Sequence, residues 1–157
     1  MSTITALEQL HQEAFDRKVE IDRHYFQATD KSRCFKDGDY ELVVLNMSSI
    51  DSQAKEYVVL AEELSHLETS ALYHITNNFN TRISRQNRQK AEAKAIQHMI
   101  NKILPTSKIQ SCLDKHLLSS CEIAEELCVT TEWVERAIDY HRSRGVVFSF
   151  DNTDNCA

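Results

Sequence analysis

Apolar and polar residues alternate along most of this chain with the period of an α-helix. From Thr5 to about Gln27, the apolar side chains fall close to one helix face and charged residues occupy the others. We therefore expect a long first helix in this segment. Asp51 can cap the N-terminus of a second amphipathic helix, which should run to about Leu67.

The segment between these two helices has a different pattern. The runs Arg33–Lys36 and Tyr40–Leu45 flank the dipeptide Asp37-Gly38, which is typical of a tight β-hairpin turn. This pattern predicts a small antiparallel sheet.

The remainder of the chain again favours helices. The polar, Asn-rich segment Thr69–Arg82 is typical of a loop, and Ser84 can cap the helix that follows it. That helix should run to about Leu104, and two helices should follow over about Ser107–Leu118 and Cys121–Leu127. Thr130 can cap a last helix to about Arg144. We expect a short strand over Val146–Phe150 and a flexible tail over residues 151–157.

The scarcity of turn residues supports a helical fold. The 157 residues include only two glycines and one proline, which favours long helices over a turn-rich β fold. We therefore predict a single α+β domain over residues 1–150, mostly helical with a small antiparallel sheet, in which the helices of residues 107–145 form a helical extension.

Charge and composition narrow the function classes. The formal net charge of −6 argues against nonspecific nucleic-acid binding by the whole surface. No apolar run approaches the roughly 20 residues that a membrane helix needs, and the N-terminus lacks the pattern of a signal peptide. The five cysteines are odd in number and form no C-x-x-C motif, so we expect reduced thiols in a cytoplasmic protein.

The second expected helix carries three side chains that could serve a metal site. Glu62 and His66 are four residues apart and therefore share one helix face, which continues the apolar stripe of Val58 and Val59. Glu63 lies between them in sequence. This is the layout of the H-E-x-x-H motif, in which two helix ligands hold zinc and the glutamate acts as general base, but Glu62 replaces the first histidine.

A later helix carries a further inward carboxylate. Glu92 lies in line with the apolar residues Ile96, Met99 and Ile103. A charged group that faces a core needs a partner, a hydrogen-bond network or a metal ion. Glu62, His66 and Glu92 could thus supply the three protein ligands of a catalytic zinc site. The alternative is a solvated charged face with an ordinary surface Glu–His pair.

These motifs together resemble the ImmA/IrrE metallo-endopeptidases of phages and other mobile elements. The resemblance lies in Tyr57–His66 followed by Thr69, in Glu92-Ala93-Lys94-Ala95 with Pro105 thirteen residues after the glutamate, in the hairpin before the motif helix, and in Ile123–Val134, which is similar to the closing helices of the family. Many phage-type members have the same Glu-for-His exchange. Ser65 departs from the glycine that usually precedes the second histidine.

The resemblance implies a fold, a chemistry and a partner. The fold would be zincin-like, with Glu63 as the catalytic base and Glu62, His66 and Glu92 as metal ligands. The cofactor would be Zn²⁺, or Mn²⁺ or Fe²⁺ because Glu62 makes the site less positive and cleavage slow. The partner would be a helix-turn-helix repressor of a phage or mobile element. The alternative is a pseudo-peptidase that binds and antagonises this repressor without cutting it.

Other arrangements give competing hypotheses. Glu8 and His11 repeat the E-x-x-H spacing of Glu63 and His66, as in di-iron bundles, but the expected hairpin argues against a four-helix bundle. Tyr73 and His74 could supply an oxyanion donor or simply anchor a loop. A zinc cluster could be imagined from Cys112, His116, Cys121 and Cys128, but we expect these cysteines to be core thiols. The basic run Arg82, Arg85, Arg88 and Lys90 is typical of a solvated face or of a site for an acidic partner.

The segment Ile123–His141 also has helix-turn-helix spacing. A DNA-reading helix would begin near Thr131, but its first exposed residues include Glu132 and Glu135, which repel phosphate. We therefore expect a packed helix pair rather than direct DNA binding.

Overall fold

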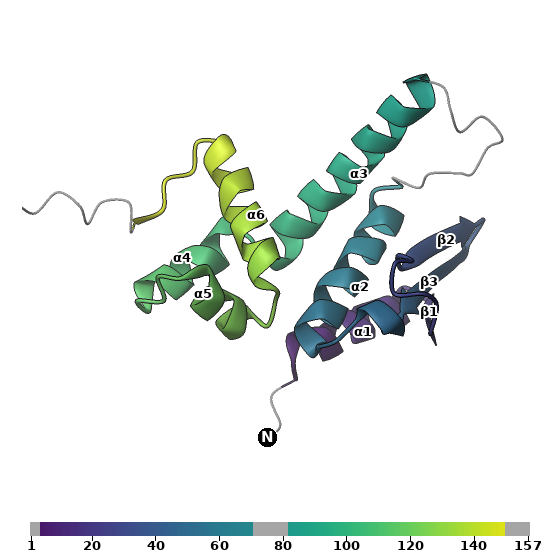
Figure 1. Ribbon diagram of the computed structural model, residues 1–157, viewed down its shortest axis with the longest axis horizontal. Helices are drawn as coiled ribbons and strands as arrows, with labels where there is room; N and C mark the ends of the chain where they lie inside the picture. Colours follow the sequence, from purple (N-terminus) through teal and green to yellow (C-terminus); the bar gives the residue numbers. More distant parts are fainter. Residues whose placement is uncertain (1–3, 71–81, 150–157) are drawn as a thin grey trace, which may run out of the picture. The chain divides into compact units, whose positions relative to one another are not determined.

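The computed structural model describes residues 4–70 and 82–149, and it confirms a mostly helical α+β fold with a small sheet (Figure 1). The elements are α1 (Ala6–Asp16), β1 (Val19–His24), β2 (Arg33–Asp37), β3 (Tyr40–Asn46), the 3₁₀ helix η1 (Met47–Ser49), α2 (Gln53–Glu68), α3 (Arg82–Ile103), α4 (Thr106–Asp114), α5 (Ser120–Leu127) and α6 (Thr131–Ser143). The chain divides into two compact units, with the boundary between Met99 and Ile100 within α3. No helix of the described residues is both long and apolar enough to cross a membrane.

The first helix is shorter than the sequence pattern predicts. α1 begins with a capping box, in which the Thr5 hydroxyl accepts from the Glu8 backbone N–H and the Glu8 carboxylate accepts from that of Thr5. The prediction that this helix continues to about Gln27 is wrong, because it ends at Asp16 and the backbone of Lys18 adopts a left-handed φ of 61°.

Strand β1 follows this break and pairs in parallel with β3. Its residues Val19, Glu20, Ile21 and Asp22 alternate apolar and acidic with the period of a strand. The backbone hydrogen bonds that hold this strand come from a segment about 20 residues away, so the local helical periodicity did not reveal it.

The predicted hairpin is present as β2 and β3. These strands are antiparallel, and Asp37 pairs with Tyr40 across the turn. Gly38 has a φ of 59°, a conformation that glycine adopts without a steric penalty. Because β1 adds a parallel neighbour, the sheet has the order β1-β3-β2 and is mixed rather than purely antiparallel.

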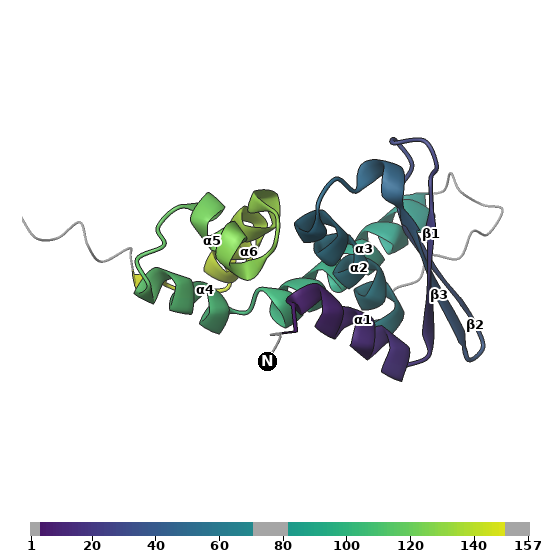
Figure 2. The same ribbon diagram turned by 90° about the horizontal axis from the view of Figure 1, so that it is seen from below.

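One face of this sheet packs against α1 and α2. Val43 and Leu45 of β3 are fully buried together with Leu60 and Leu64 of α2. The opposite face has no described helix over it (Figure 2). The sheet therefore has an inner face in the core and an outer face at the surface.

The second unit contains the end of α3 and the helices α4, α5 and α6. Ile123 and Val134 are buried, as expected for a packed α5–α6 pair, and Trp133 is buried beside them. Buried His141 donates a hydrogen bond from Nε2 to the backbone oxygen of Leu104 at 2.9 Å. These contacts give α6 a structural role in the second unit.

The prediction of a closing strand over Val146–Phe150 is wrong for residues 146–149, which are the part that the structure describes. Val146–Ser149 contain no strand residues. Phe148 instead inserts into the core with 1% of its surface exposed, and the Ser149 backbone N–H donates to the Gln110 side chain at 3.3 Å. One buried ring, rather than a strand partner, therefore fixes this segment.

Several helix ends also differ from the expected positions. Ser52 rather than Asp51 caps α2, and α3 begins at Arg82, before Ser84. α4 ends at Asp114 instead of Leu118, and His116 follows with a left-handed φ of 61°. The tail at residues 151–157 lies outside the described residues, as does nearly all of the loop expected over Thr69–Arg82.

Asn46 fixes the loop between β1 and β2. Its buried side chain donates from Nδ2 to the backbone oxygens of Gln27 and Asp30, each at 2.8 Å. Its Oδ1 accepts from the backbone N–H groups of Phe26 and Ser48, each at 3.1 Å. One side chain thus satisfies three backbone groups of this loop and one of η1.

We expect Asn46→Ala to lower the free energy of unfolding by about 2–4 kcal/mol, because it leaves several backbone groups without partners. Urea denaturation checks this, with Asn101→Ala as the control, since Asn101 is exposed and donates to the Tyr140 hydroxyl at 3.1 Å. Equal stability of the two variants would contradict this account of the loop.

Candidate metal centre

Helix α2 positions three of the four candidate site residues. Its buried side includes Val58, Ala61 and Leu64, which hold the helix against the core of the first unit. This packing fixes the rotation of α2, so that Glu62 and His66 share one face and Glu63 lies to its side. All three are partly buried.

Helix α3 supplies the fourth residue, Glu92. A nitrogen of His66 and carboxylate oxygens of Glu62 and Glu92 all lie within 4.8 Å of one another. The His66 Nε2 atom is 3.5 Å from Glu92 Oε2. The structure therefore brings together the three residues that the sequence suggested as ligands.

The donor set fits a divalent cation. Metal–ligand bonds of about 2.0–2.2 Å in a tetrahedral zinc site place neighbouring ligand atoms about 3.4 Å apart. The separation of 3.5 Å between His66 Nε2 and Glu92 Oε2 is close to this value, and the Glu62 oxygen lies within 4.8 Å of both ligand atoms. Glu62, His66 and Glu92 could thus hold a metal ion with two oxygen ligands and one nitrogen ligand.

The group is enclosed on the α2 side and open on the α3 side. The side chain of His66 is 13% exposed, whereas that of Glu92 is 44% exposed. A cation held here would therefore lie between a largely shielded imidazole and a more exposed carboxylate.

The carboxyl group of Glu63 sits in an unusual environment. Burial is the main cause that raises its pKa to about 8, and the Glu62 and Glu92 carboxylates add to the effect. A hydrogen bond with the Cys34 thiol and the charge of Lys31 act in the opposite direction. Without a cation nearby, Glu63 is therefore largely protonated at neutral pH.

Cys34 is a site neighbour that the sequence patterns did not indicate. It lies on β2 opposite Val43, whose side chain faces the core, and its thiol hydrogen-bonds Glu63. Burial first, and then the charge of Glu63, raise the pKa of this thiol. The thiol therefore stays protonated, and the strand register could have suggested its inward orientation.

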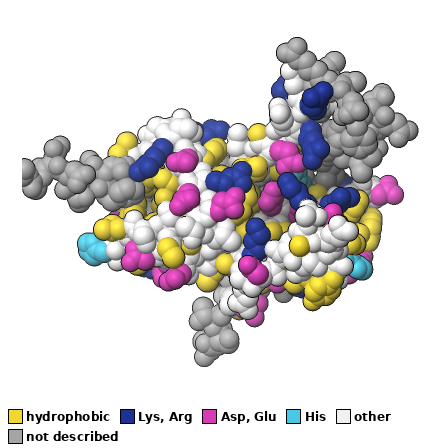
Figure 3. Space-filling model, viewed as in Figure 1, with side chains coloured by type: hydrophobic (Ala, Val, Ile, Leu, Met, Phe, Trp, Pro, Cys, Tyr) yellow, Lys and Arg dark blue, Asp and Glu magenta, His cyan; other side chains and the backbone are white. Residues whose placement is uncertain are grey.

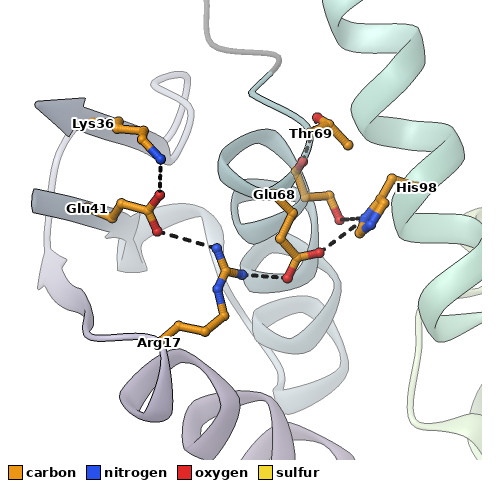
Figure 4. Close-up of polar contacts among 7 residues, drawn as sticks. Arg17, Lys36, Glu41, Glu68, Thr69 and His98 are labelled. Carbon is orange, nitrogen blue, oxygen red and sulfur yellow. Dashed lines mark hydrogen bonds and ion pairs between the residues drawn. The ribbon is translucent and has the colours of Figure 1, made fainter. Parts of the chain in front are cut away.

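A second set of polar contacts joins α2 to α3 beyond the metal group. His98 Nδ1 lies 3.2 Å from Glu68 Oε2 and 3.4 Å from the Ser65 hydroxyl. Glu68 also accepts from Arg17, the residue that follows α1, at 2.5 Å, and Arg17 contacts Glu41 of β3 at 3.3 Å (Figure 4). These contacts link four elements around the C-terminal end of α2.

Ser65, which precedes His66, contributes to the contact between α2 and α3. It is fully buried, and its hydroxyl reaches His98 of α3. A glycine at this position would have no side chain to make that contact. Lys94 adds another connection, from its ammonium to the backbone oxygen of Thr69 at 2.8 Å.

The competing arrangements are not assembled in the described residues. Glu8 is engaged in its capping box, and His11 contacts Glu56 and Arg23 instead. Cys112 is buried, Cys121 and Cys128 are exposed, and they form no metal-binding group with His116 in the part of the chain that the structure describes. Tyr73 and His74 lie outside that part.

Comparisons with known proteins gave no match to a family model, a curated protein or a solved structure. The candidate site therefore stands on its own geometry.

The raised pKa of Glu63 predicts how stability depends on pH in the metal-free protein. The folded state retains the Glu63 proton up to about pH 8, whereas the ordinary pKa is 4.5. The stability that protonated Glu63 contributes to the folded state is therefore complete below pH 4.5 and is lost as the pH rises through 8.

Glu63→Gln removes this titration, so the variant should lose less stability than the wild type between pH 5 and pH 9. Urea denaturation in EDTA measures this, with Glu125→Gln, a change at an exposed glutamate of α5, as the control. The interpretation fails if the wild type and Glu63→Gln show the same pH dependence.

Proposed function

We propose that this protein is a zinc-dependent endopeptidase that acts on a partner protein, with Glu63 as its general base. The observation that carries the proposal is the convergence of Glu62, His66 and Glu92 beside the half-buried Glu63. Three protein ligands with a carboxylate base next to them form the usual plan of a zinc hydrolase.

The bound cation would supply Lewis-acid polarisation of water and of the peptide carbonyl. With two carboxylate ligands and one neutral imidazole, a Zn²⁺ site has a formal charge of about zero rather than +1. The less positive site favours slow cleavage, and it also suits Mn²⁺ or Fe²⁺, which prefer more oxygen ligands.

The residues of the chain then provide the proton transfers. Glu63 would accept a proton from the attacking water and deliver it to the leaving amine. Cys34, from β2, contacts the same carboxyl group and would hold it in place. A weak thiol donor leaves the carboxylate more basic than a charged donor would.

The sequence resemblance supports the choice of partner. The spacing of Glu62, Glu63, His66 and Glu92 resembles that of the ImmA/IrrE metallo-endopeptidases. By that resemblance, the substrate is a helix-turn-helix repressor of a phage or mobile element, and the cleavage is regulatory. Slow turnover suffices for an enzyme that inactivates a single partner.

Glu62 also favours a second candidate function. A carboxylate in place of the first histidine lowers the charge of the site and hence its catalytic power. The protein would then act as a pseudo-peptidase that binds the repressor and antagonises it without cleavage.

Metal binding should stabilise the fold, because a cation would offset the repulsion between the Glu62 and Glu92 carboxylates. We expect the melting temperature of the wild type to be several degrees higher with Zn²⁺ than with EDTA. Glu92→Gln and His66→Gln should lose most of this shift, whereas the control Glu125→Gln should keep it. An equal shift in all four proteins would contradict a site at these residues.

Cleavage separates the two candidate functions. The purified protein is incubated with Zn²⁺ and the repressor encoded next to it, and fragments are followed by mass spectrometry. We expect fragments from the wild type and at least about a hundredfold slower cleavage with Glu63→Gln, because the general base is lost. Release of the repressor from its operator by both proteins, without fragments, would instead establish the pseudo-peptidase.

A further inference from the structure

The outer face of the sheet carries an apolar surface beside the candidate metal centre. Along β2, Cys34 points inward toward Glu63, so its neighbours Arg33 and Phe35 point outward. Phe35 is 48% exposed, and hydrophobic side chains gather on the surface in the region of the sheet (Figure 3). Such a grouping on a small unit is typical of an interaction site.

A cavity of about 240 Å³ opens on this face. Its lining combines apolar and charged side chains, namely Phe26, Asp30, Lys31, Arg33, Phe35 and Val44. The volume is sufficient for one large apolar side chain and its flanking backbone. Two cations and one carboxylate surround the apolar part, so the local charge is positive on a chain whose net charge is −6.

The cavity is held in place before any partner binds. Asn46 fixes the backbone at Phe26 and Asp30, and the Asn46 backbone N–H donates to the hydroxyl of Ser32 at 2.9 Å. The Phe26 ring stacks on His24 with 5.6 Å between the ring centres. A partner would therefore meet a formed surface, which reduces the entropic cost of binding.

We propose that this cavity is a docking site for the protein substrate, and that it binds a segment in which a bulky apolar side chain is flanked by carboxylates. The apolar side chain would pack on Phe26, Phe35 and Val44, and the carboxylates would pair with Lys31 and Arg33. This proposal rests on the proposed function, since it assigns the cavity to the substrate of the same site.

The position of the cavity relative to Glu63 supports this assignment. Only strand β2 separates them, because Cys34 contacts Glu63 on one side while Arg33 and Phe35 line the cavity on the other. Lys31 lines the cavity and its charge is also felt at Glu63. A segment anchored here could therefore pass over the β2 edge and place its next residues near the metal group.

Nucleic acid fits this surface poorly. Asp30 lines the cavity, and Glu20 and Asp22 lie on the outer side of the neighbouring part of the sheet, in register with Leu42 and Val44. These carboxylates would repel a phosphate backbone. A short acidic segment that reaches only Lys31 and Arg33 avoids this repulsion.

The test measures binding separately from cleavage. The probe is a fluorescein-labelled octapeptide with a central Leu-Phe pair flanked by aspartates, titrated by fluorescence anisotropy into full-length Glu63→Gln protein. A second probe has lysines in place of the aspartates. The protein variants are Arg33→Glu and Phe35→Ser, with Tyr25→Ser as the control, because Tyr25 is 82% exposed but does not line the cavity.

We expect the aspartate probe to bind about tenfold more weakly to Arg33→Glu and to Phe35→Ser than to the parent, and unchanged to Tyr25→Ser. The lysine probe should bind the parent weakly and gain affinity on Arg33→Glu. All variants should melt within a few degrees of the parent, since the three altered side chains are exposed.

Equal affinity of the aspartate probe for the parent and both cavity variants would overturn the proposal. So would concentration-dependent self-association that Phe35→Ser abolishes without any probe binding, because the cavity would then hold a second copy of the chain. Both results are independent of cleavage. If the wild-type protein binds the probe at the cavity but does not cut the repressor, the docking site is supported and the proposed peptidase activity is contradicted.

Discussion

The crowding of carboxyl groups between α2 and α3 is the interaction that makes this part of the molecule a candidate metal centre. Carboxylate oxygens of Glu62 and Glu92 lie within 4.8 Å of a His66 nitrogen. Burial, together with the charges of these two carboxylates, raises the pKa of the neighbouring Glu63 to about 8. Without a cation, such a grouping lowers the stability of the helix pair, because like charges in a partly buried site repel each other. A divalent cation at the same place turns the repulsion into coordination.

The surrounding fold holds this grouping in place. The inner face of the sheet packs against α2, while the Arg17–Glu41 and Arg17–Glu68 contacts fix the C-terminal end of that helix. His98 joins the same end to α3. The helices that carry the candidate ligands are thus connected through polar contacts, which include the contact between the Ser65 hydroxyl and His98.

The sequence was informative where a pattern is local and failed where the partner is distant. The stripe from Val58 to His66 and the Asp37-Gly38 dipeptide were sufficient to predict α2 and the hairpin, and the stripe around Glu92 suggested the third ligand. Strand β1 was missed because its hydrogen bonds come from β3. Cys34 and His98 were also missed, since each acquires its role only through a residue on another element.

The most direct measurement is X-ray absorption at the zinc edge of the purified protein loaded with one equivalent of Zn²⁺. We expect one tightly held zinc per chain, with a single imidazole and otherwise oxygen ligands at about 2.0–2.2 Å. A sulfur ligand at about 2.3 Å would indicate a site at cysteines instead. Several imidazole ligands, or no retained zinc, would also contradict a centre built from Glu62, His66 and Glu92.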